Sequence, residues 1–368
     1  MKRLRHLIWL LVPMALLAEP LHLSAGWIFL LCCAALIPLA GAIGGATEQL
    51  AHRMGPAAGG LFNASFGNAA ELIIGIVALS KGLTVVVKAS ITGSILGNLL
   101  LVTGAAMLAG GWKRKSLPFS SAAAGAHAAQ LALAVVGLLV PGIFFHAAES
   151  AHQPGLVNGV SLGVSGILIL TYFAGLGFAF KTHSHLFSAA HPAEAPENPW
   201  STKRAMATLI AASATTAILA EELVGAIEPV AKSYGMTEVF LGVVLLALVG
   251  NAAEHATAVL LARKGQMDTA LQITMQSSLQ IALFVAPVLV FLSHALGHPM
   301  ELVFTELEII SVVAAVAVVI ITTLDGETNW FEGFQLLAVY AILAVAFYFL
   351  PPELAGIGHG AVSPVAPK

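Results

Sequence analysis

Long, almost uninterrupted apolar runs fill this chain and leave few ways to fold it. Hydrophobic residues make up 58% of its 368 residues and charged residues only 10%, against about 25% in ordinary soluble chains. A helix that crosses a bilayer needs about 20 mostly apolar residues, whereas barrel strands need alternation. The runs therefore predict an all-α polytopic membrane protein with about eleven transmembrane helices. They lie at residues 6–23, 25–45, 57–79, 86–110, 120–143, 157–180, 205–227, 237–262, 270–295, 302–323 and 332–350.

The positions of Lys and Arg predict the orientation of the chain. Cytoplasmic loops of membrane proteins carry an excess of these two residues. With the N-terminus inside, only Lys81, Lys88, Lys232 and Lys368 of the 16 Lys and Arg residues fall outside. We therefore expect a cytoplasmic N-terminus and an outside C-terminus. The first run is interpreted as an uncleaved helix, with a removed signal peptide as the alternative.

One polar stretch divides the chain into two halves. Residues 181–204 are rich in Pro, Ser, His and Glu, a composition typical of a flexible linker, here predicted to be cytoplasmic. The predicted organisation is an N-terminal transmembrane helix over residues 1–24, a five-helix repeat over 25–180, the linker over 181–204, a second five-helix repeat over 205–350 and a tail over 351–368.

The two halves share a motif. The sequence Gly-Asn-Ala-Ala-Glu occupies residues 67–71 and again residues 250–254, an offset of 183. The same offset pairs Lys81-Gly82 with Lys264-Gly265 and Ser94 with Ser277. Because each half contains five predicted spans, the second copy enters the membrane from the opposite face. This is an inverted repeat, in which secondary transporters bind their substrate at the midplane between the copies.

Each copy of the motif places a carboxylate inside a predicted span. Glu71 lies near the middle of the third span and Glu254 in the second half of the eighth, and neither span contains Lys or Arg. A charge at a helix centre costs about 2.5–3.5 kcal/mol on insertion scales. Such a cost at the same position of both repeats indicates function, with interhelical hydrogen bonding as the structural alternative.

The residues around the two glutamates offer only oxygen ligands. Glycines let a helix or an ion approach the backbone, and an opened turn would free carbonyl oxygens. Oxygen donors suit Ca²⁺, Mg²⁺, Mn²⁺ or Na⁺, and two carboxylates balance a divalent charge. Burial and mutual repulsion also favour protonation of the pair, so two protons could replace one cation. The candidate metal site comprises Glu71, Glu254, Asn68, Asn251, Gly67, Gly250, Ser94, Ser277 and Gln280.

These motifs resemble the signatures of the Ca²⁺/H⁺ antiporter (CAX) family of the cation/Ca²⁺ exchanger superfamily. The resemblance rests on residues 59–75 and 249–255, with support from residues 93–100, 276–283 and 324–333, and it covers nearly the whole chain beyond the first span. It implies eleven helices, Ca²⁺ held between Glu71 and Glu254, and alternating access that exports Ca²⁺ from the cytoplasm in exchange for protons. Sodium-coupled branches typically carry Pro where this chain has Ala70 and Ala253, which favours protons. Gln276 is a departure, because the family more often has Gly there.

Other functions are less well supported by the sequence. A formal net charge of −3 argues against a nucleic-acid partner. The helices show no nucleophile–base pair and no phosphate-binding loop, so we expect neither an enzyme nor a resident cofactor. The expected partners are Ca²⁺, protons and lipid, in the cell (inner) membrane of a prokaryote, and a homo-oligomer is left open. Exchange of another cation for H⁺, or of Na⁺ for Ca²⁺, is the alternative function, and a passive channel is a third class.

Overall fold

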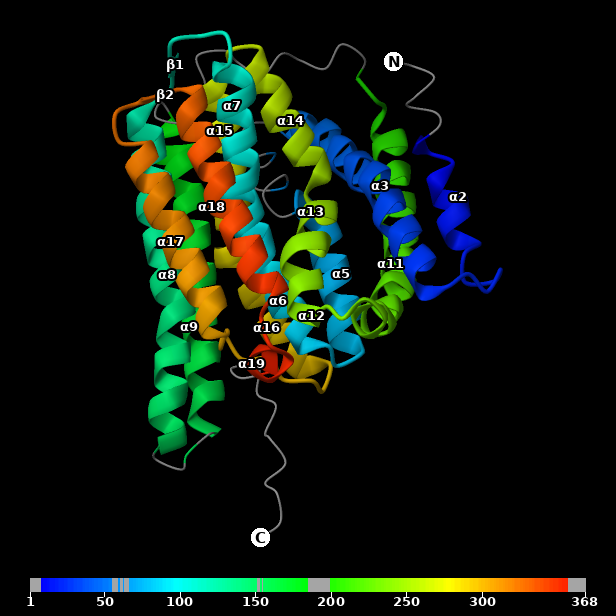
Figure 1. Ribbon diagram of the computed structural model, residues 1–368. Helices are drawn as coiled ribbons and strands as arrows, with labels where there is room; N and C mark the ends of the chain where they lie inside the picture. Colours follow the sequence, from blue (N-terminus) through cyan, green and yellow to red (C-terminus); the bar gives the residue numbers. More distant parts are fainter. Residues whose placement is uncertain are drawn as a thin grey trace.

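The computed structural model describes residues 8–54, 59, 62, 66–150, 153, 155–184 and 199–356. In this part of the chain the fold is a bundle of helices joined at one end by a single pair of two-residue strands (Figure 1). The first half contains α2 (Leu11–Leu16), α3 (Ala25–Met54), α5 (Ala69–Ser80), α6 (Thr84–Leu96), η1 (Gly97–Val102), α7 (Thr103–Gly111), β1 (Leu117–Pro118), α8 (Ser121–Ser150), α9 (Gly155–Gly177) and η2 (Phe178–Thr182).

The second half begins after the predicted linker, of which residues 185–198 lie outside the described residues. Its elements are α11 (Thr202–Tyr234), α12 (Glu238–Phe240), η3 (Leu241–Leu246), α13 (Ala247–Gly250), α14 (Ala252–Arg263), α15 (Met267–Gln280), η4 (Ile281–Val285), α16 (Ala286–Ala295), α17 (Glu306–Thr322), β2 (Glu327–Thr328), α18 (Trp330–Tyr348) and α19 (Pro352–Gly356). The η elements are π-helical turns within longer helices. Strand β1 pairs antiparallel with β2 through Leu117–Thr328 and Pro118–Glu327.

The predicted all-α membrane architecture is confirmed at the level of class. Within the described ranges, seven helices are long and apolar enough to cross a membrane, and an eighth is added if the bent pair Glu238–Gly250 and Ala252–Arg263 counts as one span. The number eleven remains a prediction. Helix α2 has only six residues in the region of the predicted first span, and residues 1–7 lie outside the described residues. Helix α5 has 12 residues because it begins after a turn at residues 67–68, and several residues of the predicted third span before that turn are not described.

Both motif glutamates lie in the first turn of a helix, beside a break that the predicted spans do not include. Asn68 and Asn251 stand immediately before α5 and α14, with φ/ψ of −97°/31° and −94°/5°, and Glu71 and Glu254 lie in the first turns. Helices α13 and α14 meet at 62° across Asn251. Gly67 therefore lies before the helix that carries Glu71. Opening of the backbone beside a glycine, which the sequence also suggested, is what the second motif shows.

Glycines let the helices that surround the motifs touch backbone to backbone. A methyl group at Gly93 on α6 would lie 2.1 Å from the carbonyl oxygen of Val243, and one at Gly242 would lie 2.6 Å from Cβ of Ala89. No side chain fits at either position, so α6 and η3 cross at the closest separation that two helices allow. This crossing brings Ser94, the next residue on α6, to the second motif.

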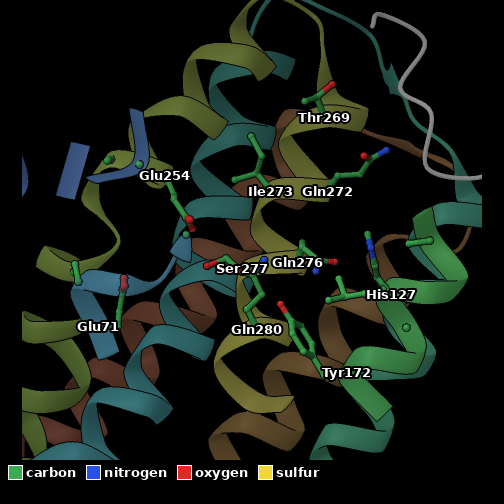
Figure 2. Close-up of a pocket in the computed structure, with 18 of the residues that line it drawn as sticks. Glu71, His127, Tyr172, Glu254, Thr269, Gln272, Ile273, Gln276, Ser277 and Gln280 are labelled. Carbon is green, nitrogen blue, oxygen red and sulfur yellow. The ribbon is translucent and has the colours of Figure 1, made fainter. Parts of the chain in front are cut away.

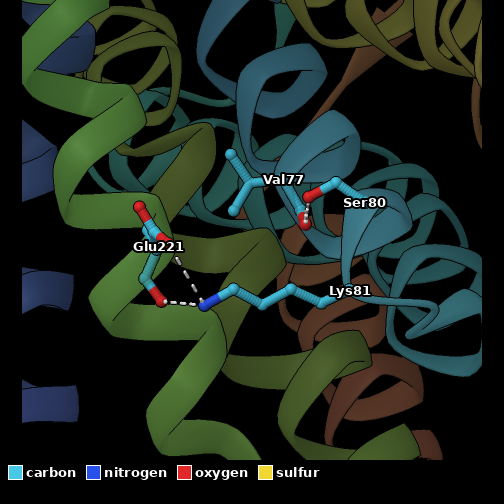
Figure 3. Close-up of polar contacts among 4 residues, drawn as sticks. All are labelled: Val77, Ser80, Lys81 and Glu221. Carbon is cyan, nitrogen blue, oxygen red and sulfur yellow. Dashed lines mark hydrogen bonds and ion pairs between the residues drawn. The ribbon is translucent and has the colours of Figure 1, made fainter. Parts of the chain in front are cut away.

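At the end of the bundle opposite the two strands, Lys81 joins α5 to α11. Its Nζ donates a hydrogen bond of 3.0 Å to the backbone oxygen of Glu221 and lies 4.0 Å from Oε1 of the same residue (Figure 3). Both side chains are exposed to solvent or headgroups, so the charge interaction itself contributes little, and the backbone contact fixes where α5 ends against α11.

Lys88, which the charge count places on the outside, is buried in α6. Only 2% of the residue is exposed, and Nζ donates to the carbonyl oxygen of Val303 at 2.8 Å. The carboxylates of Glu308 and Glu301 stabilise its charge. Glu308 in turn accepts hydrogen bonds from the Thr92 hydroxyl and from Thr305. Removing Lys88 from the charge count leaves the predicted orientation unchanged, since it belonged to the minority on the outside.

We expect Lys88→Ala to destabilise the fold by about 3 kcal/mol, because removal of one partner leaves buried carboxylates uncompensated. The exposed Lys81→Ala should change stability by less than about 1 kcal/mol. Thermal unfolding of the two purified variants in the same detergent measures the difference. Equal unfolding temperatures for both variants would contradict the assignment of Lys88 to a buried charge cluster.

Candidate cation site

A cavity of about 430 Å³ lies between the two halves of the chain. It is lined by six of the nine residues that the sequence singled out, namely Gly67, Glu71, Gly250, Glu254, Ser277 and Gln280. Its wall continues along α15 to Thr269 and along α9 and η2 to Phe180, so the cavity extends from the two motifs toward the end of the bundle that carries β1 and β2 (Figure 2). Ser120, beside β1, donates its backbone N–H to Asp268 at the start of α15.

The two motif glutamates face the same cavity from different halves of the chain. Figure 2 shows Glu71 and Glu254 projecting inward from separate segments. Glu71 lies directly against the second motif, because a methyl group at Gly250 would be 3.2 Å from its Cγ and Oε1 atoms. Neither carboxylate forms an ion pair with a Lys, Arg or His in the described part of the chain. The positive ends of the dipoles of α5 and α14, whose first turns hold Glu71 and Glu254, favour negative charge there.

In both motif asparagines, the side-chain nitrogen donates hydrogen bonds and the side-chain oxygen has no donor in the described part of the chain. Asn68 Nδ2 donates to Oε1 of Gln280, and Asn251 Nδ2 donates to Ser94 Oγ and to the Ala247 carbonyl, both at 3.1 Å. The nitrogen of each amide is therefore occupied. The oxygens Asn68 Oδ1 and Asn251 Oδ1 are buried and have no hydrogen-bond donor among the described residues, and the same holds for Glu254 Oε2.

Buried polar atoms without a partner are uncommon in folded proteins. Eight occur among the described residues: these three oxygens and five Ser or Thr hydroxyls. Asn68 Oδ1, Asn251 Oδ1 and Glu254 Oε2 belong to the two copies of one sequence motif. Each is a hydrogen-bond acceptor that could also coordinate a cation. Such oxygens fit a cation, whose positive charge replaces the missing donors. No group of three His, Cys, Asp or Glu side chains that could hold a metal occurs in the described ranges.

The remaining predicted ligands occupy supporting positions. Ser94 lies behind the cavity wall, and its hydroxyl holds Asn251. The oxygen of Gln280 is already used by Asn68. Ser277 lines the cavity, accepts a 2.9 Å hydrogen bond from Asn98 Nδ2 and hydrogen-bonds the Glu254 side chain. These three side chains orient the amide and carboxylate oxygens of the motifs.

The structure adds Asn98 to this network, a residue that the sequence indicated only through the family resemblance. Asn98 is 1% exposed in the π-helical turn η1, and its Oδ1 lies 3.2 Å from Nε2 of His255. Since Asn98 Nδ2 donates to Ser277, its oxygen accepts from His255, which ties η1 to α14. Asn98 is four residues after Ser94, so the sequence could have placed it on the same helix face. His127, Gln130 and Tyr172 from α8 and α9 also line the cavity and carried no such signal.

Comparison with known proteins identifies the family. The model of the sodium/calcium exchanger protein family matches residues 24–181 and again residues 204–349. A Ca²⁺/H⁺ antiporter, ChaA, of Bacillus subtilis is 43% identical over 92% of this chain and 97% of its own length. A Ca²⁺/H⁺ antiporter of Aphanothece halophytica is 42% identical over 94% and 96%.

Solved structures agree with these matches. The structure of native YfkE is 40% identical, covers 93% of this chain and 100% of its own, and superposes with a TM-score of 0.81. The crystal structure of the H⁺/Ca²⁺ exchanger CAX, at 14% identity and a TM-score of 0.72, shows the same fold. The chain is thus a member of the sodium/calcium exchanger protein family. Within it, the chain belongs to the CAX branch that its two motifs resemble, and that prediction is confirmed.

Gly250→Ala should lower the apparent affinity for Ca²⁺ by about tenfold, as is typical when a group that orients a metal ligand is disturbed. The added methyl would press on the Glu71 side chain, 3.2 Å away. Gly44→Ala is the matched control, because Gly44 lines the same cavity and a methyl group there would meet no atom within 4 Å. Titration with Ca²⁺ in detergent measures both affinities, and equal affinities would contradict the contact between the motifs.

Proposed function

We propose that this protein is a secondary transporter that exchanges Ca²⁺ for H⁺ by alternating access. The observation that carries the proposal is that two copies of one motif bring two carboxylates to one cavity, each beside a buried asparagine oxygen that has no donor among the described residues. Its relatives of about 40% identity are Ca²⁺/H⁺ antiporters by name, which supports the same cargo here.

The proposed Ca²⁺ ligands are the carboxylates of Glu71 and Glu254 and the amide oxygens of Asn68 and Asn251. Ca²⁺ accepts six to eight oxygens in flexible geometry, so water in the cavity and main-chain oxygens near Gly67 and Gly250 would complete the shell. Two carboxylates neutralise the divalent charge, which makes the loaded site neutral inside the membrane. Ser94, Ser277 and Gln280 hold these ligands in place.

Protons compete for the same carboxylates. Without a cation, two negative charges in a membrane interior are costly, and protonation of both gives a neutral site again. A cycle of one Ca²⁺ against two H⁺ therefore keeps the site neutral at each crossing. The energy comes from the proton gradient, and no resident cofactor is required.

The proposal also includes the number of spans, their arrangement in repeats and their orientation in the membrane. Eleven spans arranged as an N-terminal helix and two inverted five-helix repeats agree with two separate matches of the family model. The cavity extends to the end of the bundle that carries β1, next to Lys113, Arg114 and Lys115, which the charge rule places in the cytoplasm. The conformation described here would then be open to the cytoplasm, ready to bind Ca²⁺ for export across the cell membrane.

Replacing either Glu71 or Glu254 by Gln should abolish exchange, because the amide keeps the shape but removes the charge and the proton site. Glu306→Gln, which removes an exposed carboxylate at the start of α17, should leave exchange unchanged. The measurement is Ca²⁺ flux in vesicles with an imposed pH gradient and no sodium. Near-normal flux in both site variants would overturn the proposal. Flux that requires Na⁺ would favour sodium–calcium exchange instead.

Acidification on the side from which Ca²⁺ binds should lower its apparent affinity, because carboxylate ligands must lose their protons to bind a metal. With two protons displaced, the fall approaches about a hundredfold per pH unit once both carboxyl groups are protonated. Equilibrium Ca²⁺ titrations between pH 6 and 8 provide the test. An affinity independent of pH would show that protons and Ca²⁺ use different groups.

A further inference from the structure

We infer that Gln272 and Gln276 form a second, transient station for a partly hydrated divalent cation between the cavity mouth and the glutamates. The inference rests on the proposed function, since it concerns the route by which the cargo reaches Glu71 and Glu254. Both side chains line the cavity, and both are uncharged.

The two residues belong to a row of three amides on one face of α15. Gln272, Gln276 and Gln280 recur at every fourth residue and all three line the cavity. Helix geometry separates successive members by about 6 Å along the axis. Figure 2 shows the three side chains following α15 from the level of Thr269 down to that of Tyr172. The row therefore extends from the Thr269 end of the cavity to Gln280, which accepts the hydrogen bond from Asn68.

The outermost amide is oriented by a fixed acid. Gln272 Nε2 donates a 3.2 Å hydrogen bond to Oδ2 of Asp268, whose Oδ1 accepts from the backbone N–H of Ser120 at 3.0 Å. With its nitrogen held by Asp268, Gln272 keeps its carbonyl oxygen for the cavity. An oxygen presented in this way attracts cations and repels anions.

The middle amide is unrestrained. Gln276 makes no side-chain hydrogen bond to any residue that the structure describes, although its neighbour Ser277 is held by Asn98. A long, unanchored amide beside the site can rotate its oxygen from Gln272 toward Glu254. The innermost amide, Gln280, has its oxygen bound to Asn68 and so ends the row.

Uncharged amide oxygens bind a cation weakly, so they suit its passage better than its tight binding. They replace some waters of a hydrated cation without holding it as carboxylates would, and the cavity of about 430 Å³ has room for the rest of the shell. Ca²⁺ exchanges ligands readily, whereas Mg²⁺ gives up water reluctantly. The station therefore assists cations that can shed part of their shell, which favours Ca²⁺ over Mg²⁺ during approach.

The test is the double variant Gln272→Leu/Gln276→Leu, assayed for Ca²⁺/H⁺ exchange from each membrane face. We expect KM for Ca²⁺ to rise about fivefold on the face that exposes Lys113, as for the loss of about one polar contact. Vmax for Ca²⁺ taken up from that face and the equilibrium Ca²⁺ affinity should stay unchanged. Because a substitution cannot alter the equilibrium of the exchange, Vmax/KM in the opposite direction should fall by the same factor. Gln272→Leu/Gln276→Asn, which keeps one amide, should raise KM less than the double leucine variant. Ile273→Leu, on the same cavity wall, should leave KM unchanged.

An unchanged KM on both faces would overturn the station. A matching loss of equilibrium Ca²⁺ affinity would instead show that the glutamines only support the main site. Failure of the proposed function is a separate result, because it would appear as exchange that survives Glu71→Gln in the otherwise native protein.

Discussion

A carboxylate in a membrane interior needs a positive partner, and that requirement shapes the centre of this protein. Glu71 and Glu254 face one cavity without an ion pair to any basic side chain that the structure describes. A permanent lysine partner would satisfy them but would also fix their charge. Leaving them unpaired makes the site dependent on mobile positive charge, which is the property an exchanger of cations and protons requires.

The backbone helps to stabilise the two unpaired carboxylates. Each glutamate lies in the first turn of a helix that an asparagine precedes, so helix dipoles face the carboxylates. The two asparagine oxygens are buried without a donor among the described residues. The close crossing at Gly93 and Gly242 brings Ser94 to Asn251. By contrast, the other buried charges, Lys88 and Glu308, are satisfied by fixed partners, which is how a purely structural charge cluster is built.

Much of this could be predicted from sequence, because apolar run length and a repeated motif report directly on membrane helices and on buried carboxylates. The family and the membrane class followed from those two signals. What the sequence could not supply was local geometry. Hydropathy does not register a helix break, so Glu71 and Glu254 were placed inside continuous helices. Side-chain orientation is also invisible in sequence, so the hydrogen bonds that Gln280 and Ser94 accept from Asn68 and Asn251 could not be predicted.

The most direct test of the account is the location of a bound ion. Crystals of the protein grown at neutral pH with Ca²⁺, or with a heavier divalent substitute, should show an anomalous peak between Glu71 and Glu254. The account predicts that Asn68 Oδ1 and Asn251 Oδ1 coordinate that ion. A divalent ion found elsewhere in the membrane region, with the two glutamates and both asparagine oxygens uncoordinated, would contradict it.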